Sequence, residues 1–116
     1  MLTLEQMKEI VKTTNVIFFK DHCPFCETSE HLMNALVDKS IVTEYSVYYL
    51  DRDFDNQTLK ELVSESGWTA KPFQEFPTKP QIYIQNKYIG GNKDFYLSEF
   101  NQSETRSEER RVGKEC

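Results

Sequence analysis

Residues 16–26 read Val-Ile-Phe-Phe-Lys-Asp-His-Cys-Pro-Phe-Cys, and this stretch decides the fold that we expect. Val16 to Phe19 are four large apolar residues in a row, which is typical of a strand covered on both faces. A polar turn follows, and Pro24 then takes the first position of a helix, where its missing N–H costs nothing. The stretch therefore predicts a buried strand, a tight turn and a helix that begins at two cysteines.

The segments on either side predict more elements of both kinds. Apolar residues recur at helical spacing in four segments, which predicts helices over 3–14, 24–38, 55–67 and 94–101. Continuous or alternating apolar runs predict strands over 16–19, 44–50, 81–85 and 88–89, with the turn Asn86-Lys87 before the last. Strands separated by helices pair in parallel, whereas a tight turn makes an antiparallel pair. We expect an α/β fold, a four-stranded mixed sheet flanked by helices.

Helix ends and loops refine this expectation. Thr3 and either Asp55 or Asn56 are expected N-caps, and Gly67 is an expected C-cap. Residues 68–79 have no strong period, so they are expected to form a loop whose length is typical of a functional or mobile segment. Trp68 and Phe73 are both in this loop, and they belong either to the core or to a surface that contacts a partner.

Composition excludes several classes of protein. The 116 residues are enough for about one domain, and the net charge of -5 argues against a nucleic-acid partner. The longest apolar run is far shorter than the ~20 residues that span a bilayer, and no signal pattern opens the chain. We expect no membrane partner and a cytoplasmic location. Three cysteines, only two of them close together, do not form the disulfide framework of a secreted domain.

The last residues differ from the rest. Residues 104–116 contain four basic residues and four Glu, with only Val112 and Cys116 as apolar residues. Such a segment cannot bury a face, so it is expected to be disordered. It also resembles sequence read through from an adapter or vector. We therefore expect a domain over 1–103 and a tail over 104–116 that is not native to the fold, with no role for Cys116.

Cys23 and Cys26 are the candidate reactive groups, because in a reducing compartment a Cys-x-x-Cys pair is usually redox-active or metal-binding. The free N–H groups of the following helix favour a thiolate at Cys23, and Lys20 and protonated His22 would add positive charge. In such settings a thiol pKa falls from about 8.5 to roughly 3.5–7.5. Cys23 is the expected nucleophile, and Cys26 is expected to resolve the mixed disulfide on Cys23. A structural pair of core cysteines is the competing interpretation.

Metal sites are poorly supported by the remaining ligand-type residues. Zinc needs about four ligands, and His22 and His31 lie far apart on a turn and a helix. The acidic residues at 51, 53 and 55 begin like a calcium loop, but Asn56 stands where Gly is needed and Leu62 where the bidentate Glu belongs. We expect no metal.

Three segments, in order, resemble the motifs of the dithiol glutaredoxins, a family of the thioredoxin superfamily. Residues 18–26 resemble the active-site segment Lys-x-x-Cys-Pro-Tyr-Cys, with Phe25 in place of Tyr. Residues 77–84 resemble the Thr-Val-Pro segment, and residues 89–94 resemble the Gly-Gly-x-x-Asp segment. The resemblance covers about residues 3–102 and implies a thioredoxin-like fold, here with an extra N-terminal helix. The compact chain and long loop resemble glutaredoxins of large bacterial viruses.

The resemblance implies a glutathione site beside the cysteines. Pro80 would be a cis-proline that faces them, and the backbone of Lys79 would pair with the cysteinyl part of glutathione. Lys20 would hold the glycyl carboxylate, and Phe25 would line the site. From the residues alone, an ordinary trans-proline that opens a strand is the default for Pro80.

The second half of the implied site follows Gly90. Gly90 and Gly91 would let the backbone approach a ligand closely, and the amides of Asn92 and Lys93 would hold the glutamyl carboxylate. A plain turn at the end of a strand is the competing interpretation of the two glycines. The chain departs from the family at Lys93, where Asp, Ser or Thr is usual, and in its longer loop before Pro80. Gln74 is our hypothesis for the second contact to the glycyl carboxylate.

Taken together, these observations predict a glutathione-dependent thiol-disulfide oxidoreductase. It would reduce protein disulfides and glutathione mixed disulfides, with glutathione as the reducing co-substrate and ribonucleotide reductase as one candidate substrate by resemblance. We expect a monomer, and no iron-sulfur cluster, because relatives with Pro after the first cysteine generally hold none. The alternatives are a redoxin of the same fold that depends on thioredoxin reductase, and a non-catalytic thioredoxin-like module that binds a partner through residues 68–79.

Overall fold

The structure is a computed structural model, and it describes residues 1–101. The predictions for the tail at 104–116, and for Cys116 in it, lie outside the described residues. Eight elements follow one another in the order α1 (Leu4–Thr13), β1 (Asn15–Phe19), α2 (Pro24–Asp38), β2 (Tyr45–Tyr49), α3 (Asn56–Glu65), β3 (Gln81–Ile84), β4 (Lys87–Gly90) and α4 (Asn92–Tyr96).

The four strands form one mixed sheet in the order β2-β1-β3-β4. Strand β1 pairs in parallel with β2 and antiparallel with β3, and β3 pairs antiparallel with β4. All five residues of β1 are buried, as expected for a strand covered on both faces. The predicted four-stranded mixed sheet is therefore confirmed.

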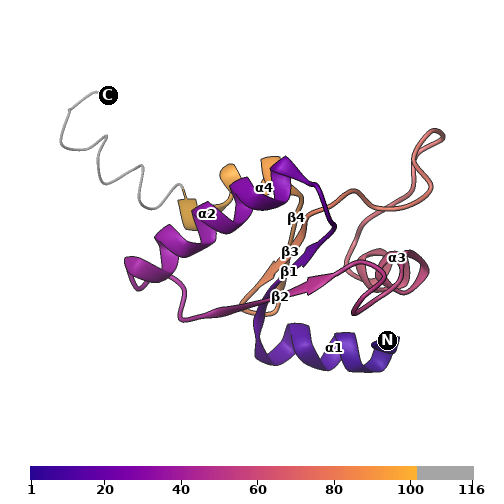
Figure 1. Cartoon of the computed structure of the whole chain (residues 1–116), viewed down its shortest axis with the longest axis horizontal. Coiled ribbons are helices and arrows are strands. Elements are labelled where there is room, and N and C mark those ends of the chain that lie inside the picture. The colour runs from indigo at the N-terminus through magenta and orange to yellow at the C-terminus, as the bar shows by residue number, and fades with distance from the viewer. Residues whose placement is uncertain (102–116) are drawn as a thin grey trace.

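Helices cover both faces of this sheet (Figure 1). On one face, α2 and α4 enclose a core that includes Met33, Leu36 and Phe95. On the other face, α1 and α3 enclose a second core around Phe18 and Phe54, whose rings meet edge to face at 5.3 Å. The flanking helices complete the predicted α/β class.

One pairing differs from the prediction. Strand β3 is separated from β2 by α3, yet it runs antiparallel to β1, with Gln81 opposite Phe18. The reason is the path of residues 66–80. They carry the chain from the end of α3 back to the end of the sheet at which β1 finishes. Strand β3 therefore begins where β1 ends, which places Pro80 next to the cysteine turn.

The predicted caps of the first and third helices are present. The Thr3 side chain accepts the N–H of Gln6 at 3.1 Å, and the Gln6 side chain accepts the N–H of Thr3 at 2.8 Å. Asp55 caps α3 by accepting the N–H of Thr58 at 2.7 Å. Gly67 adopts φ +113° and ends that helix one residue after its C-cap, Ser66.

Three predicted boundaries at the end of the domain are wrong: the hairpin turn and both ends of the last helix. The hairpin turn lies at Gln85-Asn86, not Asn86-Lys87. Gln85 and Asn86 both take positive φ, as a tight hairpin requires. Helix α4 begins at Asn92, not Asp94, because the Asp94 carboxylate accepts the N–H of Gly91 at 3.1 Å from inside the first turn. It ends at Tyr96, where the Ser98 hydroxyl donates back to the carbonyl of Phe95 at 2.7 Å.

Candidate active site

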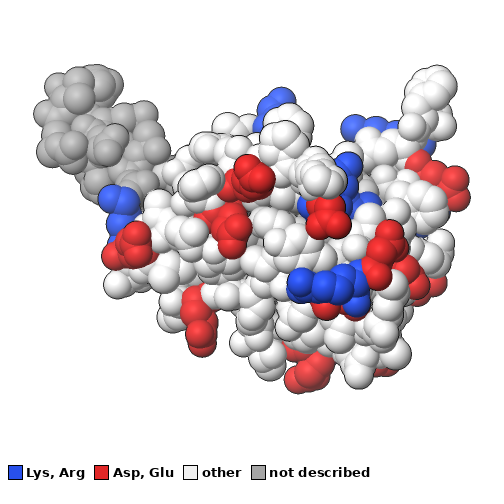
Figure 2. All heavy atoms as spheres, in the orientation of Figure 1, with Lys and Arg blue, Asp and Glu red and all other residues white. Residues whose placement is uncertain are grey.

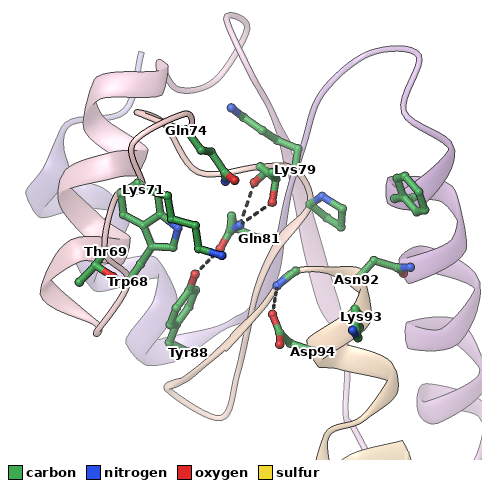
Figure 3. A pocket seen from close by; sticks show the side chains of 14 residues that line it. Trp68, Thr69, Lys71, Gln74, Lys79, Gln81, Tyr88, Asn92, Lys93 and Asp94 are labelled. Carbon is green, nitrogen blue, oxygen red and sulfur yellow. Dashed lines mark hydrogen bonds between the residues drawn. The ribbon is translucent and has the colours of Figure 1, made fainter.

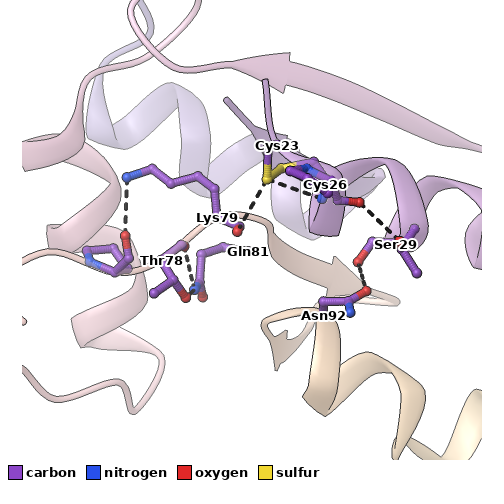
Figure 4. Close-up of a disulfide and its surroundings, with 10 residues drawn as sticks. Cys23, Cys26, Ser29, Thr78, Lys79, Gln81 and Asn92 are labelled. Carbon is purple, nitrogen blue, oxygen red and sulfur yellow. Dashed lines mark hydrogen bonds between the residues drawn. A yellow bond between two sulfur atoms is a disulfide. The ribbon is translucent and has the colours of Figure 1, made fainter. Parts of the chain in front are cut away.

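The two cysteines lie where β1 gives way to α2. His22 takes φ +54° in the turn, and Cys23 is the N-cap of the helix. The Cys23 sulfur accepts the N–H of Cys26 at 3.2 Å, and the two sulfurs are joined in a disulfide with the Cα atoms 5.2 Å apart (Figure 4). A thiolate at Cys23 would keep this hydrogen bond and would face the positive end of α2.

The two sulfurs differ in their access to the surface. Cys23 lines a cavity of about 410 Å³ together with Lys20 and Phe25, whereas Cys26 lines none of the described cavities of residues 1–101. The exposed fractions, 5% for Cys23 and 1% for Cys26, follow the same order. Cys23 is therefore the more accessible of the two sulfurs, and the attacking and resolving roles of the two cysteines stay predictions.

The Lys79-Pro80 bond is cis, as the resemblance implied. The Lys79 carbonyl oxygen lies 3.6 Å from the Cys23 sulfur, so a reduced thiol there can donate to it. The Lys79 side chain points away, and its ammonium donates to Asn56 and, at 3.1 Å, to the carbonyl of Pro77. Burial lowers the pKa of Lys79, and the nearby charge of Lys20 lowers it further. Only the backbone of Lys79 is therefore available to a ligand at Cys23.

Gly90 and Gly91 have different structural roles. Gly90 adopts φ +111°, and a Cβ there would stand 2.5 Å from the Asp94 carboxylate, so glycine is strongly favoured there. At Gly91 a Cβ would meet the Pro80 carbonyl oxygen at an ordinary 3.6 Å, so the N-terminus of α4 lies against the cis-proline. Asn92 follows, and its side-chain oxygen accepts the Ser29 hydroxyl at 2.7 Å, which ties α4 to α2.

A second cavity, of about 540 Å³, adjoins the first, since Phe25, Thr78 and Lys79 line both. Figure 3 shows its two sides: Asn92 and Lys93 lie opposite Trp68 and Lys71. We call residues 20–26 and 90–93 the cysteine wall and residues 68–76 the loop wall, with residues 78–81 as the floor between them. The predicted site residues that line one cavity or the other are Lys20, Cys23, Phe25, Lys79, Pro80, Gly91, Asn92 and Lys93, and Gln74, hypothesised as a further contact, lines the larger cavity from the loop wall.

Several residues of the site were not singled out from the sequence. Gln81 is 2% exposed, and it donates to the Thr78 carbonyl at 2.8 Å and accepts from the Tyr88 hydroxyl. Burial raises the pKa of Tyr88, so its hydroxyl stays neutral and remains a donor. This series of hydrogen bonds depends on the pairing of β3 with β4, and no local sequence signal indicates that pairing. Ser29 could have been found, because it lies three residues after Cys26 on the same helical face.

Trp68 and Phe73 of the loop wall lie in different surroundings. Trp68 is partly buried and packs against the core between the sheet and α3. The side chain of Phe73 is fully exposed, at the tip of the loop. Trp68 thus packs on the core and also borders the larger cavity, whereas Phe73 lies on the surface.

The sequence is similar to those of known glutaredoxins. The chloroplastic glutaredoxin-C4 of rice (Oryza sativa subsp. japonica) is 31% identical over 94 residues, which are 80% of this chain and 62% of the rice protein, less than two thirds of its length. The glutaredoxin of Haemophilus influenzae is 35% identical over 80 residues, 69% of this chain and 83% of that protein. The chain belongs to the glutaredoxin family. Its Cys23-Cys26 pair is that of a thiol-disulfide oxidoreductase. No family model matches the sequence.

Solved glutaredoxin structures support the fold. Wheat glutaredoxin is 26% identical, with a TM-score of 0.59 over 90% of this chain and 91% of the wheat chain. A buckwheat glutaredoxin-glutathione complex is 21% identical, with a TM-score of 0.60 over 90% of this chain and 87% of the buckwheat chain. The thioredoxin-like architecture is therefore that of the family.

Within residues 1–101, every helix is too short or too polar to span a lipid bilayer. The same residues contain no group of three or more His, Cys, Asp or Glu side chains that could hold a metal ion.

Proposed function

We propose that this glutaredoxin depends on glutathione and reduces both protein disulfides and glutathione mixed disulfides. The observation that carries the proposal is the position of Cys23: its sulfur opens to a cavity beside the backbone of a cis-proline and a cationic side chain, Lys20. The buckwheat relative, which has the same architecture over 90% of this chain, was solved as a complex with glutathione.

The reaction begins at the reduced Cys23-Cys26 pair. The Cys23 thiolate attacks one sulfur of the substrate disulfide, forms a mixed disulfide and releases the other sulfur as a thiolate that takes up a proton. Cys26 then loses its proton and attacks Cys23, which releases the second substrate thiol and leaves Cys23-Cys26 oxidised. Two molecules of glutathione supply the two electrons that restore the dithiol, and they leave as glutathione disulfide.

Glutathione would lie along the floor of the site. The backbone of Lys79, whose side chain is engaged elsewhere, would pair with the cysteinyl part, and Phe25 would cover it from the cysteine wall. Lys20 would pair with the glycyl carboxylate. The amides of Asn92 and Lys93 in the first turn of α4 would hold the glutamyl carboxylate, because first-turn N–H groups lack partners within the helix.

The test compares two reducing systems. The oxidised protein is mixed with glutathione, glutathione reductase and NADPH, and separately with thioredoxin reductase and NADPH, with a glutathione mixed disulfide or a protein disulfide as substrate. We expect NADPH consumption with the first system for both substrates. Turnover with thioredoxin reductase alone would contradict the proposal and assign the chain to the redoxins that ignore glutathione.

The proposal extends to the setting and the substrates. A Cys-x-x-Cys pair that glutathione keeps reduced suits a cytoplasmic location, where the glutathione pool is reducing. Ribonucleotide reductase is a candidate protein substrate, and the reaction that tests it is reduction of its oxidised form by the glutathione system above.

A further inference from the structure

The loop wall is an ordered part of the site. Lys71 and Gln74 exchange two backbone hydrogen bonds, of 3.2 and 3.0 Å, and so close a tight turn with Pro72 and Phe73 at its tip. At the base of the turn, Trp68 packs on the core and donates its backbone N–H to the Val63 carbonyl at 2.9 Å. The turn projects from the body next to the cavity, with an uncharged tip above charged residues (Figures 1 and 2).

The part of the cavity under this turn is a hollow that the proposed glutathione contacts leave empty. We call it the Lys71 hollow, lined by Trp68, Lys71, Gln81 and Tyr88. Its floor is fixed, because the buried Gln81 side chain is held between Thr78 and the Tyr88 hydroxyl. Figure 3 shows the Lys71 side chain extending toward Gln81 and Tyr88. The proposed glutathione ligands stand on the floor and the opposite wall, except Gln74, the hypothesised second contact to the glycyl carboxylate, which lies beside the hollow on the loop wall.

The charge of the hollow is positive. No acidic side chain of residues 1–101 forms an ion pair with Lys71. Glu75, on the same turn, approaches Lys60 instead, at 4.0 Å. Across the cavity, the Asp94 carboxylate already accepts the N–H of Gly91, whereas Lys93 lines the cavity without an acidic partner in the described chain. A carboxylate entering the hollow from a substrate would therefore meet Lys71, with Lys93 and Asp94 on the opposite side of the cavity.

We propose that the Lys71 hollow binds an acidic side chain that flanks the reactive cysteine of a polypeptide substrate. The inference rests on the proposed reduction of protein disulfides at Cys23. Because the hollow is continuous with the cavity at Cys23 through Phe25, Thr78 and Lys79, a peptide held at Cys23 can extend into it. The Trp68 ring and the stem of Lys71 cover the apolar part of that side chain, and the Lys71 ammonium meets its carboxylate.

The experiment uses single turnover of the pre-reduced protein, which needs no glutathione. The substrates are three disulfide-linked peptide dimers that differ only in the residues on both sides of the cysteine, which are Glu, Gln or Lys. Each turnover transfers two electrons from the Cys23-Cys26 dithiol to one peptide disulfide and yields two peptide thiols. Quenching in acid and separating the peptides gives the second-order rate constant of reduction.

We expect the parent protein to reduce the Glu peptide faster than the Lys peptide, and Lys71→Glu to reverse that order. The Glu peptide should slow by about fivefold, the upper range for an exposed ion pair, and the difference should shrink at high salt. Lys71→Gln should remove the preference without reversing it. Lys12→Glu is the matched control, because Lys12 lines a different cavity next to Asn15, at the opposite end of β1 from Cys23.

Two results would overturn the inference. The first is that Lys71→Glu changes the rates of all three peptides by the same factor, or changes none. The second is that it leaves the peptide rates unchanged and raises the KM for glutathione in steady state, which would assign Lys71 to the glycyl carboxylate of glutathione itself. Loss of glutathione dependence in the parent protein would leave the single-turnover rates untouched, so failure of the proposed function is distinguished from failure of this inference.

Discussion

The two walls of the site are built in different ways. In the cysteine wall, the reactive sulfur is held by a helix N-terminus, and α4 is fixed to α2 by the bond between Ser29 and Asn92. In the loop wall, the turn is closed only by backbone bonds between Lys71 and Gln74, and its tip is fully exposed at Phe73. The chemistry of the site is thus placed on packed elements, whereas the part proposed to select substrates stands on a loop.

This difference matters for substitution. A change in the cysteine wall disturbs groups that act on every disulfide, and it also disturbs buried contacts. A change in the loop wall beyond Trp68 alters surface side chains that the fold does not need, so it can change the preference among polypeptide substrates without a cost in stability. Four predictions test this contrast.

The largest expected effect is at the two cysteines. Cys23→Ser should lower the rate with every disulfide substrate by at least about 1000-fold, because it removes the nucleophile. Cys26→Ser should keep turnover of a small glutathione mixed disulfide and lose reduction of protein disulfides, because the buried second thiol acts only on the mixed disulfide at Cys23. Steady-state NADPH consumption with both substrates checks this, and equal losses in the two variants would contradict the assigned roles.

A smaller effect, on stability, is expected from the glycines that border each wall. Gly90→Ala and Gly67→Ala both place a side chain at positive φ, at a cost of about 1 kcal/mol each. Gly90→Ala should cost about 1–2 kcal/mol more, since its Cβ would stand 2.5 Å from the Asp94 carboxylate, whereas nothing lies within 4 Å of a Cβ at Gly67. Urea unfolding of the two variants measures the difference, and equal costs would show that Asp94 moves aside freely.

At the base of the loop wall, Tyr83 fastens the end of α3 through a 2.7 Å bond between its hydroxyl and that of Ser66. Tyr83→Phe should lower the free energy of unfolding by about 1 kcal/mol, the usual contribution of one hydrogen bond.

Burial raises the pKa of Tyr83 to about 12, so between pH 10 and pH 12 the folded protein keeps a proton that the unfolded chain loses. The free energy of unfolding therefore falls with pH in that window, and Tyr83→Phe should reduce this fall. An unchanged slope in the variant would contradict the assignment to Tyr83.

The smallest effect on stability is expected at the two exposed phenylalanines, one on each wall. Phe25→Ser and Phe73→Ser should each change the free energy of unfolding by less than about 0.5 kcal/mol, because both side chains are mostly exposed. Only Phe25→Ser should raise the KM for glutathione, by about threefold, since it lines the cavity at Cys23. A similar rise in Phe73→Ser would place the loop wall in the glutathione site and remove the contrast between the walls.

The amino-acid sequence by itself determined the strand, turn and helix of residues 16–26 and the two cysteines at the helix start. These features depend on interactions within a few residues: an apolar run, a proline at the first helical position and the N–H groups of one helical turn. The cap at Thr3, and a cap at either Asp55 or Asn56, were predicted for the same reason. The glycines at 90 and 91 were singled out because φ and side-chain size are local properties.

Only the tertiary structure decided how distant segments meet. The antiparallel course of β3 depends on the path of residues 66–80 after α3, and this path is what brings Pro80 to Cys23. The bond from Ser29 to Asn92 and the chain from Tyr88 through Gln81 to Thr78 join residues whose spacing in the sequence carries no signal. Such contacts are set by strand register and helix packing, which involve the whole chain at once. Local patterns therefore find the reactive cysteines, whereas the approach of Pro80 and of the two glycines to them was implied only by the family resemblance.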